Sequence, residues 1–189
     1  MEYLNIAKDN NIVIAEDKKY PRQALVDGTI KEINKSGSTV LSLEFAENQF
    51  SLKCVVDDKH LSFDLFLKNI TGAGWKDKPY VKRCQVSNIQ KKNPVKNDIV
   101  KDKHYNLILG YYNFDSNPIF VAWDPYRYLH HKTLRSCYVT VDALKRGYEK
   151  KFFECVVSSQ KCWIFIGERF AEFVERYISY ISDTYLKGE

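Results

Sequence analysis

The stretch Phe50–Asn69, FSLKCVVDDKHLSFDLFLKN, decides the fold class of this chain. Every second residue is apolar in two runs, which are Phe50, Leu52, Cys54 and Val56, then Leu61, Phe63, Leu65 and Leu67. A period of two is typical of a β-strand that buries one face. Asp57-Asp58-Lys59, between the two runs, has the composition of a turn. The stretch therefore predicts two strands joined by a turn.

Strand-like segments continue on both sides of this stretch. They are Val40–Phe45, Tyr80–Ile89, Asn106–Tyr112, Pro118–Trp123, Cys137–Val141 and, within 154–166, Trp163–Ile166. Asn106–Tyr112 and Pro118–Trp123 flank a polar loop and predict a hairpin. The opening residues 1–19 are polar with a short apolar patch at Ile12–Ile14, and we predict no element there.

Three segments have helical spacing of their apolar residues: Arg22–Lys35, Asp142–Phe153 and Glu168–Leu186. Pro21 precedes the first and Gly37 follows it, as is typical of helix boundaries. Six or seven short strands with a few helices predict an α+β domain built on an antiparallel sheet or barrel. We expect one domain over residues 1–189, as the N-terminal part of a longer chain.

Composition excludes several classes of protein. Hydrophobic residues make up 44% and aromatic residues 14%, which is too many for a disordered chain. No apolar run reaches the roughly 20 residues of a membrane span, and residues 1–11 lack the pattern of a secretory signal, so we expect a cytoplasmic protein without membrane contact. The five cysteines contain no CxxC pair, and the adjacent His130 and His131 cannot share one face of a strand or helix. We therefore expect no metal site and no cofactor.

The net charge of +5 is concentrated in two blocks. Residues 75–103 contain nine cations and three acids, and residues 127–151 contain seven cations and two acids. Duplex DNA is a dense line of phosphate charge, so clustered Lys and Arg side chains favour DNA binding. The alternative is that these are solvated loops that contact nothing.

Within the blocks, two stretches combine cations with aromatic or hydrogen-bonding side chains, which suits contacts to bases and phosphates. Trp75–Arg83 supplies Trp75, Lys76, Lys78, Tyr80, Lys82 and Arg83. Tyr126–Arg135 supplies Tyr126, Arg127, His130, His131, Lys132 and Arg135. We predict that the two stretches fold together into one cationic cradle, with no acidic groups between them.

Motifs for catalysis are sparse. The sequence has no phosphate-binding Gly-rich loop of the Walker type, no GxSxG and no HExxH. Glu149-Lys150-Lys151, with Asp142 or Asp124 upstream, has the composition of a Mg²⁺-dependent nuclease site. However, the triplet falls in a helical pattern, where side chains two residues apart diverge. We therefore expect the domain to have no enzymatic activity, and keep a nuclease centred on Asp142, Glu149 and Lys151 as an alternative.

Several short segments also resemble a known family. They are Lys68–Ile70, Lys82–Gln85, Leu107–Tyr112, Phe120–Pro125 and the helix from Val141 to Phe153. Together, over most of residues 61–181, they resemble the N-terminal specificity domains of McrB-like restriction subunits, in particular those of the LlaJI type.

The resemblance implies a B3-like DNA-binding pseudobarrel of about seven mostly antiparallel strands with flanking helices. Such a domain would bind double-stranded DNA with two arms that straddle the major groove. An AAA+ GTPase module would follow in the same chain and would work with an McrC-like nuclease subunit. The turn 34–38, with Lys35 and Ser36, becomes a third candidate contact.

Two further hypotheses remain open at this point. The domain could recognise a modified base that is flipped out of the duplex, with Trp75, Trp123 and Trp163 as stacking candidates. Alternatively, it could be a scaffold whose basic surface meets an acidic protein partner.

Overall fold

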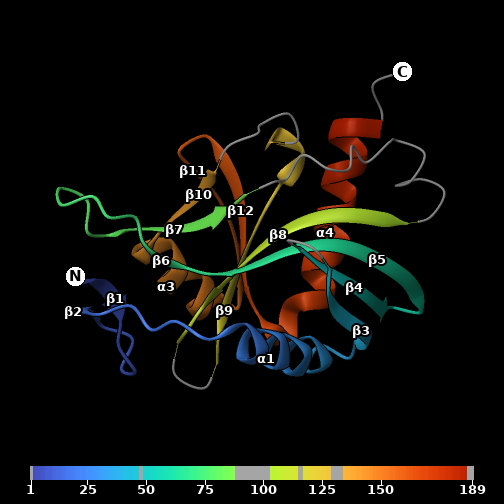
Figure 1. Ribbon diagram of the computed structural model, residues 1–189, viewed down its shortest axis with the longest axis horizontal. Coiled ribbons are helices and arrows are strands. Elements are labelled where there is room, and N and C mark those ends of the chain that lie inside the picture. Colours follow the sequence, from blue (N-terminus) through green and yellow to red (C-terminus); the bar gives the residue numbers. More distant parts are fainter. Residues whose placement is uncertain (1, 47–48, 88–102, 115–116, 129–133, 187–189) are drawn as a thin grey trace.

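The computed structural model describes residues 2–46, 49–87, 103–114, 117–128 and 134–186. Its largest element is a seven-stranded sheet with the strand order β11-β12-β9-β8-β5-β4-β3 (Figure 1). The strands are β3 (Thr39–Ala46), β4 (Gln49–Val56), β5 (Lys59–Asn69), β8 (His104–Tyr112), β9 (Ile119–Trp123), β11 (Phe152–Val157) and β12 (Gln160–Ile166). Neighbouring strands are antiparallel except β5 and β8, which run parallel. The predicted α+β class is confirmed.

A second, smaller sheet lies across the first. It has the order β10-β7-β6 and consists of β6 (Thr71–Gly72), β7 (Val81–Val86) and β10 (Arg135–Thr140). Cys84, Val86, Cys137 and Val139 of this sheet share one hydrophobic core with Ile108 and other residues of the large sheet. In the described part of the chain the two sheets do not close into a barrel, so the architecture is an open pseudobarrel of mostly antiparallel strands.

The opposite face of the large sheet is covered by two helices, α1 (Arg22–Asn34) and α4 (Phe170–Ile181). Aromatic rings fill this second core, where Phe165 stacks on Phe173 with 4.4 Å between the ring centroids. The helix α3 (Val141–Lys150) packs beside β11 and β12. Gly147 permits this close approach, since a Cβ atom there would lie 2.2 Å from the side chain of Ile164. No helix in the described ranges is both long and apolar enough to cross a membrane.

Most predicted elements are confirmed, but the structure differs from the prediction at several places. The opening segment forms a hairpin of β1 (Tyr3–Ile6) and β2 (Ile12–Ala15), which we did not predict. The helix expected to continue to Phe153 ends at Lys150, because Lys151 adopts a left-handed conformation (φ 63°) and the chain turns into β11. After α4, the predicted last helix continues as a π-helical turn over Ser182–Leu186.

Candidate nucleic-acid interface

The ribbon formed by β7 and β10 has one inward and one outward face. The register pairs Arg83 with Tyr138 and Gln85 with Ser136, while Lys82, Cys84 and Val86 occupy the alternate positions. Lys82, Cys84 and Val86 are buried, whereas Arg83, Gln85, Ser136 and Tyr138 are partly exposed. The outward face therefore presents polar and aromatic side chains that could meet a ligand.

One end of this ribbon is the loop that connects β6 to β7. Two successive turns shape it, with the Lys78 N–H donating to the Trp75 carbonyl at 3.3 Å and the Val81 N–H donating to the Lys78 carbonyl at 3.1 Å. Trp75 is 38% exposed and packs against Tyr138, with 5.0 Å between the ring centroids and the ring planes tilted by 33°. Lys78 Nζ lies 5.6 Å from the Trp75 ring centroid. The loop thus offers an aromatic pair with a cation beside it, and Lys76 and Tyr80 are exposed nearby.

Beside the outward face lies a polar groove of about 400 Å³. Its lining includes Arg83 and Gln85 from β7, Thr71 and Gly72 from β6, and Tyr3, Glu16, Asp17 and Lys19 from the N-terminal segment. The Arg83 Nε is enclosed and has no hydrogen-bond partner within the described residues. Glu16 and Asp17 place acidic groups next to Arg83, which differs from the expectation that no acids would interrupt the basic surface.

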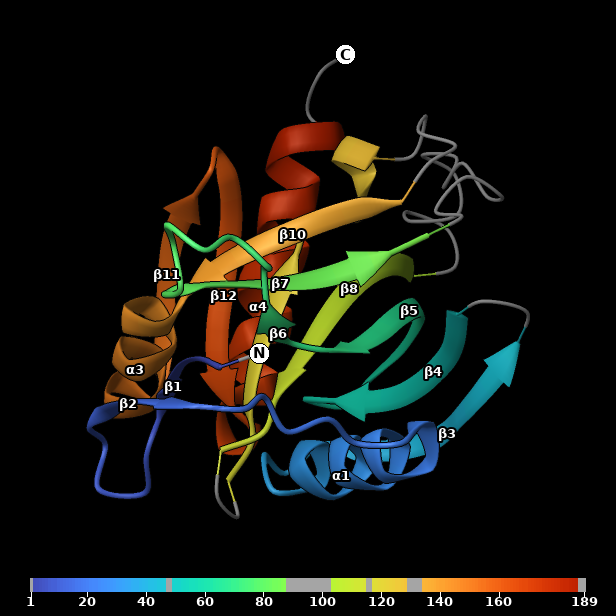
Figure 2. The same ribbon diagram turned by 60° about the vertical axis from the view of Figure 1, so that its left-hand side comes forward.

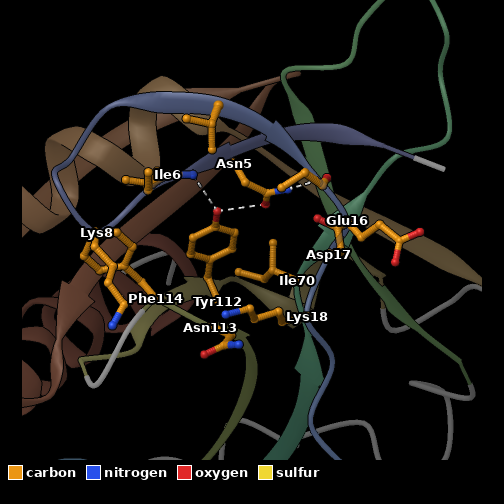
Figure 3. A pocket seen from close by; sticks show the side chains of 13 residues that line it. Asn5, Ile6, Lys8, Glu16, Asp17, Lys18, Ile70, Tyr112, Asn113 and Phe114 are labelled. Atoms are coloured by element: carbon orange, nitrogen blue, oxygen red, sulfur yellow. Dashed lines mark hydrogen bonds between the residues drawn. The ribbon is translucent and has the colours of Figure 1, made fainter.

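Lys82 does not belong to this surface. Its side chain is fully buried, its Nζ forms an ion pair with Asp17, and it donates to Asn5 Oδ1 at 2.8 Å. Burial lowers the pKa of Lys82, while the hydrogen bond and the charge of Asp17 act in the opposite direction. Figure 3 shows Asn5 and Asp17 in the neighbouring cavity, where the Tyr112 hydroxyl donates to Asn5. Lys82, which we predicted to contact DNA, is therefore buried in the structure, and its amine holds the N-terminal hairpin against β7.

The second predicted stretch begins with a 3₁₀ turn over Pro125–Tyr128. Buried Asp124 precedes this turn and accepts hydrogen bonds from the Tyr126 N–H at 2.8 Å and from the hydroxyls of Tyr180 and Tyr185. Burial raises the pKa of Asp124, and these hydrogen bonds oppose the rise. The start of the stretch is thus anchored to the C-terminal helical segment.

The candidate residues of the Tyr126–Arg135 stretch have different surroundings. Tyr126 is half-buried, and its hydroxyl accepts from the Asn106 N–H at 3.0 Å. Arg127 is exposed and donates to the Ser159 carbonyl in the β11–β12 turn. Arg135 is the first residue of β10 and is partly exposed. His130, His131 and Lys132 lie outside the described residues.

The two basic stretches occupy opposite ends of the β7–β10 ribbon. Arg135 pairs with Val86 at one end, while Tyr80, next to the Trp75 loop, accepts from the Val141 N–H just past the other end. Six residues of extended strand span about 20 Å, and Figure 2 shows the β6–β7 loop and the start of β10 well separated. The single cradle that we predicted is replaced by a long face with one basic stretch at each end.

Lys35 and Ser36 lie away from this face. Both residues close the C-terminal end of α1, where Lys35 pairs with Glu32 at 2.6 Å and Ser36 Oγ donates to the Ile33 carbonyl at 2.7 Å. In Figures 1 and 2, α1 lies on the opposite side of the molecule from β7 and β10. The structure does not bring this turn together with the other two candidate stretches.

The residues of the alternative nuclease site each interact with a different side chain. Asp142 pairs with Arg146 at 3.0 Å, Glu149 accepts from Asn10 at 2.7 Å, and Lys151 lies 3.5 Å from Glu168. Within the described part of the chain, no three His, Cys, Asp or Glu side chains form a group that could hold a metal ion.

Of the three tryptophans considered for stacking on a flipped base, Trp123 and Trp163 are buried in the two cores. Only Trp75 reaches the surface among the three. A base could therefore stack on Trp75 without a rearrangement of either core.

Sequence analysis did not identify Gln85, Ser136 and Tyr138, which lie on the outward face of the ribbon, as candidate contact residues. The signal that could have found them is the strand period itself, because Arg83 and Gln85 alternate with Lys82, Cys84 and Val86. The same alternation would have placed Lys82 on the apolar side.

The molecule is an α+β protein whose small sheet presents a polar ribbon with basic stretches at its ends. A family model described as methylase-associated X1 matches residues 62–174, from β5 to α4. The chain belongs to this methylase-associated family, and the match contains the whole ribbon and both basic stretches. Neither a search of curated proteins nor a search of solved structures found a match.

Proposed function

We propose that this domain binds double-stranded DNA on the outward face of the β7–β10 ribbon, as the recognition module of a methylation-linked restriction system. The observation that carries the proposal is the ribbon itself, with Arg83, Gln85 and the Trp75–Tyr138 pair between two basic stretches. The methylase-associated family supports the link to DNA modification.

The dimensions and chemistry of the ribbon suit a duplex. The major groove of B-DNA, about 12 Å wide, admits a two-stranded β-ribbon, and Arg and Gln side chains form bidentate hydrogen bonds with guanine and adenine. Lys76 and Lys78 at one end and Arg127 at the other are exposed. Phosphate contacts from such ends would set the register, while contacts from the face would read the sequence.

The wider system follows from the resemblance to McrB-like subunits. On this proposal the domain itself has no enzymatic activity. A GTPase module in the same longer chain and an McrC-like nuclease subunit would carry out translocation and cleavage. We also propose that the protein acts in the cytoplasm, where its DNA substrate would be.

Binding of DNA can be tested by fluorescence anisotropy with a labelled duplex of mixed sequence. Each phosphate contact contributes about 0.9 to the slope of log affinity against log salt, measured between about 50 mM and about 200 mM. Replacing both Lys76 and Lys78 with alanine should lower that slope by between one and two. Lys59→Ala, at the exposed first residue of β5, is the matched control and should leave the slope unchanged. Binding without a salt slope would argue against DNA as the ligand.

Recognition of a methylated base is a second candidate, which the exposed Trp75 ring beside the partly exposed Tyr138 favours. Stacking on an aromatic side chain contributes about 1–3 kcal/mol per base. Paired titrations with methylated and unmethylated duplexes of one sequence distinguish the two modes. A preference for the methylated duplex that disappears in Trp75→Ala would establish the second mode, and equal affinity would exclude it.

The same reagents address the remaining alternatives. Cleavage of a plasmid by the purified chain with Mg²⁺ would favour the nuclease hypothesis and overturn the assignment of a purely binding role. Failure to bind any duplex, together with salt-sensitive binding of an acidic polypeptide such as polyglutamate, would favour the scaffold.

A further inference from the structure

Four of the five cysteines form two directly opposed cross-strand pairs. Cys155 of β11 faces Cys162 of β12, and Cys84 of β7 faces Cys137 of β10. Opposed residues of antiparallel strands have Cα atoms about 4.5–5.5 Å apart, within the range of about 4.4–6.8 Å that a disulfide spans. None of the cysteines forms a disulfide in the structure. Both pairs therefore have a backbone separation that permits an S–S bond.

The two pairs differ in their access to solvent. Cys84 and Cys137 are both 0% exposed, inside the core between the two sheets. Cys155 is partly exposed and lies on β11, the last strand of the large sheet, whereas its partner Cys162 is buried. A small oxidant in solution can therefore reach Cys155 far more readily than either thiol of the inner pair.

The two pairs also differ in thiol chemistry. A hydrogen bond from Cys162 lowers the pKa of Cys155, and the nearby positive charge of Arg146 acts in the same direction. The same hydrogen bond raises the pKa of Cys162, and burial raises the pKa of Cys84 well above its ordinary value. Because the thiolate is the reactive form, Cys155 has the character of an attacking thiol and Cys162 that of a resolving thiol.

We propose that Cys155 and Cys162 are a thiol oxidation site that hydrogen peroxide converts into a reversible cross-strand disulfide. The Cys155 thiolate attacks one peroxide oxygen, the O–O bond breaks, and the products are a sulfenic acid and hydroxide. The Cys162 sulfur then displaces the hydroxyl group of the sulfenic acid, so that the S–S bond forms and water leaves with the Cys162 proton. Two thiols are oxidised by two electrons, and one peroxide is reduced to two waters.

The site contacts the backbone of β10, and Cys162 shares a core with the inward-facing residues of the ribbon. Cys162 Sγ is 3.6 Å from the carbonyl oxygen of Tyr138, whose ring packs against Trp75. The Trp123 Nε1–H donates to the same carbonyl at 3.3 Å, and the Tyr138 N–H donates to Gln160 Oε1 at 2.9 Å. Disulfide formation removes the thiol contact and leaves the other two, so the fold is retained while the support of the Tyr138 backbone changes. An effect of oxidation on DNA affinity rests on the proposed function, but the disulfide itself does not.

The experiment treats the reduced 189-residue chain with hydrogen peroxide, alkylates the remaining thiols and maps the peptides by mass spectrometry. We expect the Cys155 and Cys162 peptides to be joined with a loss of two hydrogens, and dithiothreitol to reverse the link. Cys84 and Cys137 are the internal control. Their thiols should remain reduced, and the alkylating agent should reach them only after the chain is unfolded. Oxidation of the inner pair as fast as the outer pair, or oxidation of Cys155 to sulfinic acid without a disulfide, would overturn the proposal.

Two variants separate the roles of the sulfurs. In Cys162→Ser, dimedone should trap a sulfenic acid at Cys155, because no resolving thiol is present. In Cys155→Ser, Cys162 should remain reduced at the same peroxide concentration. If Cys162 oxidises equally in the absence of Cys155, the order of attack is wrong and the proposed site fails. These readouts do not depend on DNA binding.

Discussion

Lys82 and Arg83 are neighbours in the sequence, yet they represent the two faces of the β7–β10 ribbon. Lys82 points inward to Asp17 and Asn5, and Arg83 points outward into a polar groove. Both are cations in the same basic block, but one stabilises the fold and the other has an enclosed Nε without a hydrogen-bond partner among the described residues. The face of the strand on which a cation lies therefore decides whether its charge forms a buried ion pair or is available to a ligand.

The strongest test of this contrast is to remove the partner of the inner cation. Asp17→Ala leaves the buried Lys82 amine without its counter-ion, and loss of one partner of a buried ion pair costs about 3–5 kcal/mol. We expect a decrease of that size in the free energy of unfolding, measured by urea denaturation. Asp27→Ala, at an exposed position on α1, is the control and should change it by less than about 0.5 kcal/mol.

A second variant tests whether the cost comes from the unpaired charge. Lys82→Met combined with Asp17→Ala should recover part of the lost stability, since an apolar pair avoids the burial of a charge. If the double variant is as unstable as the sum of the single ones, the hairpin depends on packing rather than on the ion pair.

Removing the outer cation, Arg83, should affect DNA affinity rather than the stability of the fold. Arg83→Ala removes a partly exposed side chain, so we expect a change in unfolding free energy below about 0.5 kcal/mol. A lost base contact costs about 1–3 kcal/mol, which is a loss of DNA affinity of about fivefold to about 150-fold. Anisotropy titrations of the wild-type chain and of Arg83→Ala at one salt concentration measure this loss of DNA affinity. An unchanged affinity would remove Arg83 from the interface and break the contrast with Lys82.

Local patterns predicted much of the fold because several strands bury only one face. The alternation in Phe50–Val56 and Leu61–Leu67 correctly predicted β4 and β5, and the helical spacing in Arg22–Lys35 correctly predicted α1. The end of α3 was missed because Phe152 continues the helical spacing from Tyr148. A left-handed, non-glycine Lys151 carries no clear sequence signal.

The candidate site was less predictable because its partners are distant in sequence. Asn5 and Asp17 lie 77 and 65 residues from Lys82, and only tertiary structure brings them together. The pairing of β7 with β10 likewise joins Arg83 to Tyr138 across 55 residues. Charge density indicated two basic stretches, but it could not show which of their cations are buried or that the stretches lie at opposite ends of the ribbon.

A smaller effect on the free energy of unfolding is expected for Gln160 of β12, which contacts the backbone of β10. Gln160 accepts a hydrogen bond from the Tyr138 N–H at 2.9 Å and donates one to the Ser136 carbonyl at 3.2 Å. These two bonds hold β10 against β12. Because a typical hydrogen bond contributes about 0.5–1.5 kcal/mol, Gln160→Ala should lower the free energy of unfolding by about 1–2 kcal/mol. Gln160→Glu keeps the acceptor for Tyr138 and loses the donor to Ser136, so it should lie between the wild type and Gln160→Ala in the same urea titration.

The smallest effect concerns pH and the anchored end of the ribbon. Burial raises the pKa of Asp124 above its ordinary value of 3.8, so the folded protein keeps this proton at a pH where the unfolded chain has lost it. Between those two values the folded state binds more protons than the unfolded state, and stability must fall as pH rises. Asp124→Asn has no such proton, and its amide oxygen can still accept from Tyr180 and Tyr185. The stability advantage of the wild type over Asp124→Asn should therefore shrink as pH rises above about 4, as urea titrations at each pH would measure. An advantage that instead grows with pH would mean that the three hydrogen bonds to the carboxylate outweigh its burial, so that the anchor of the Tyr126–Arg135 stretch is strongest in its ionised form.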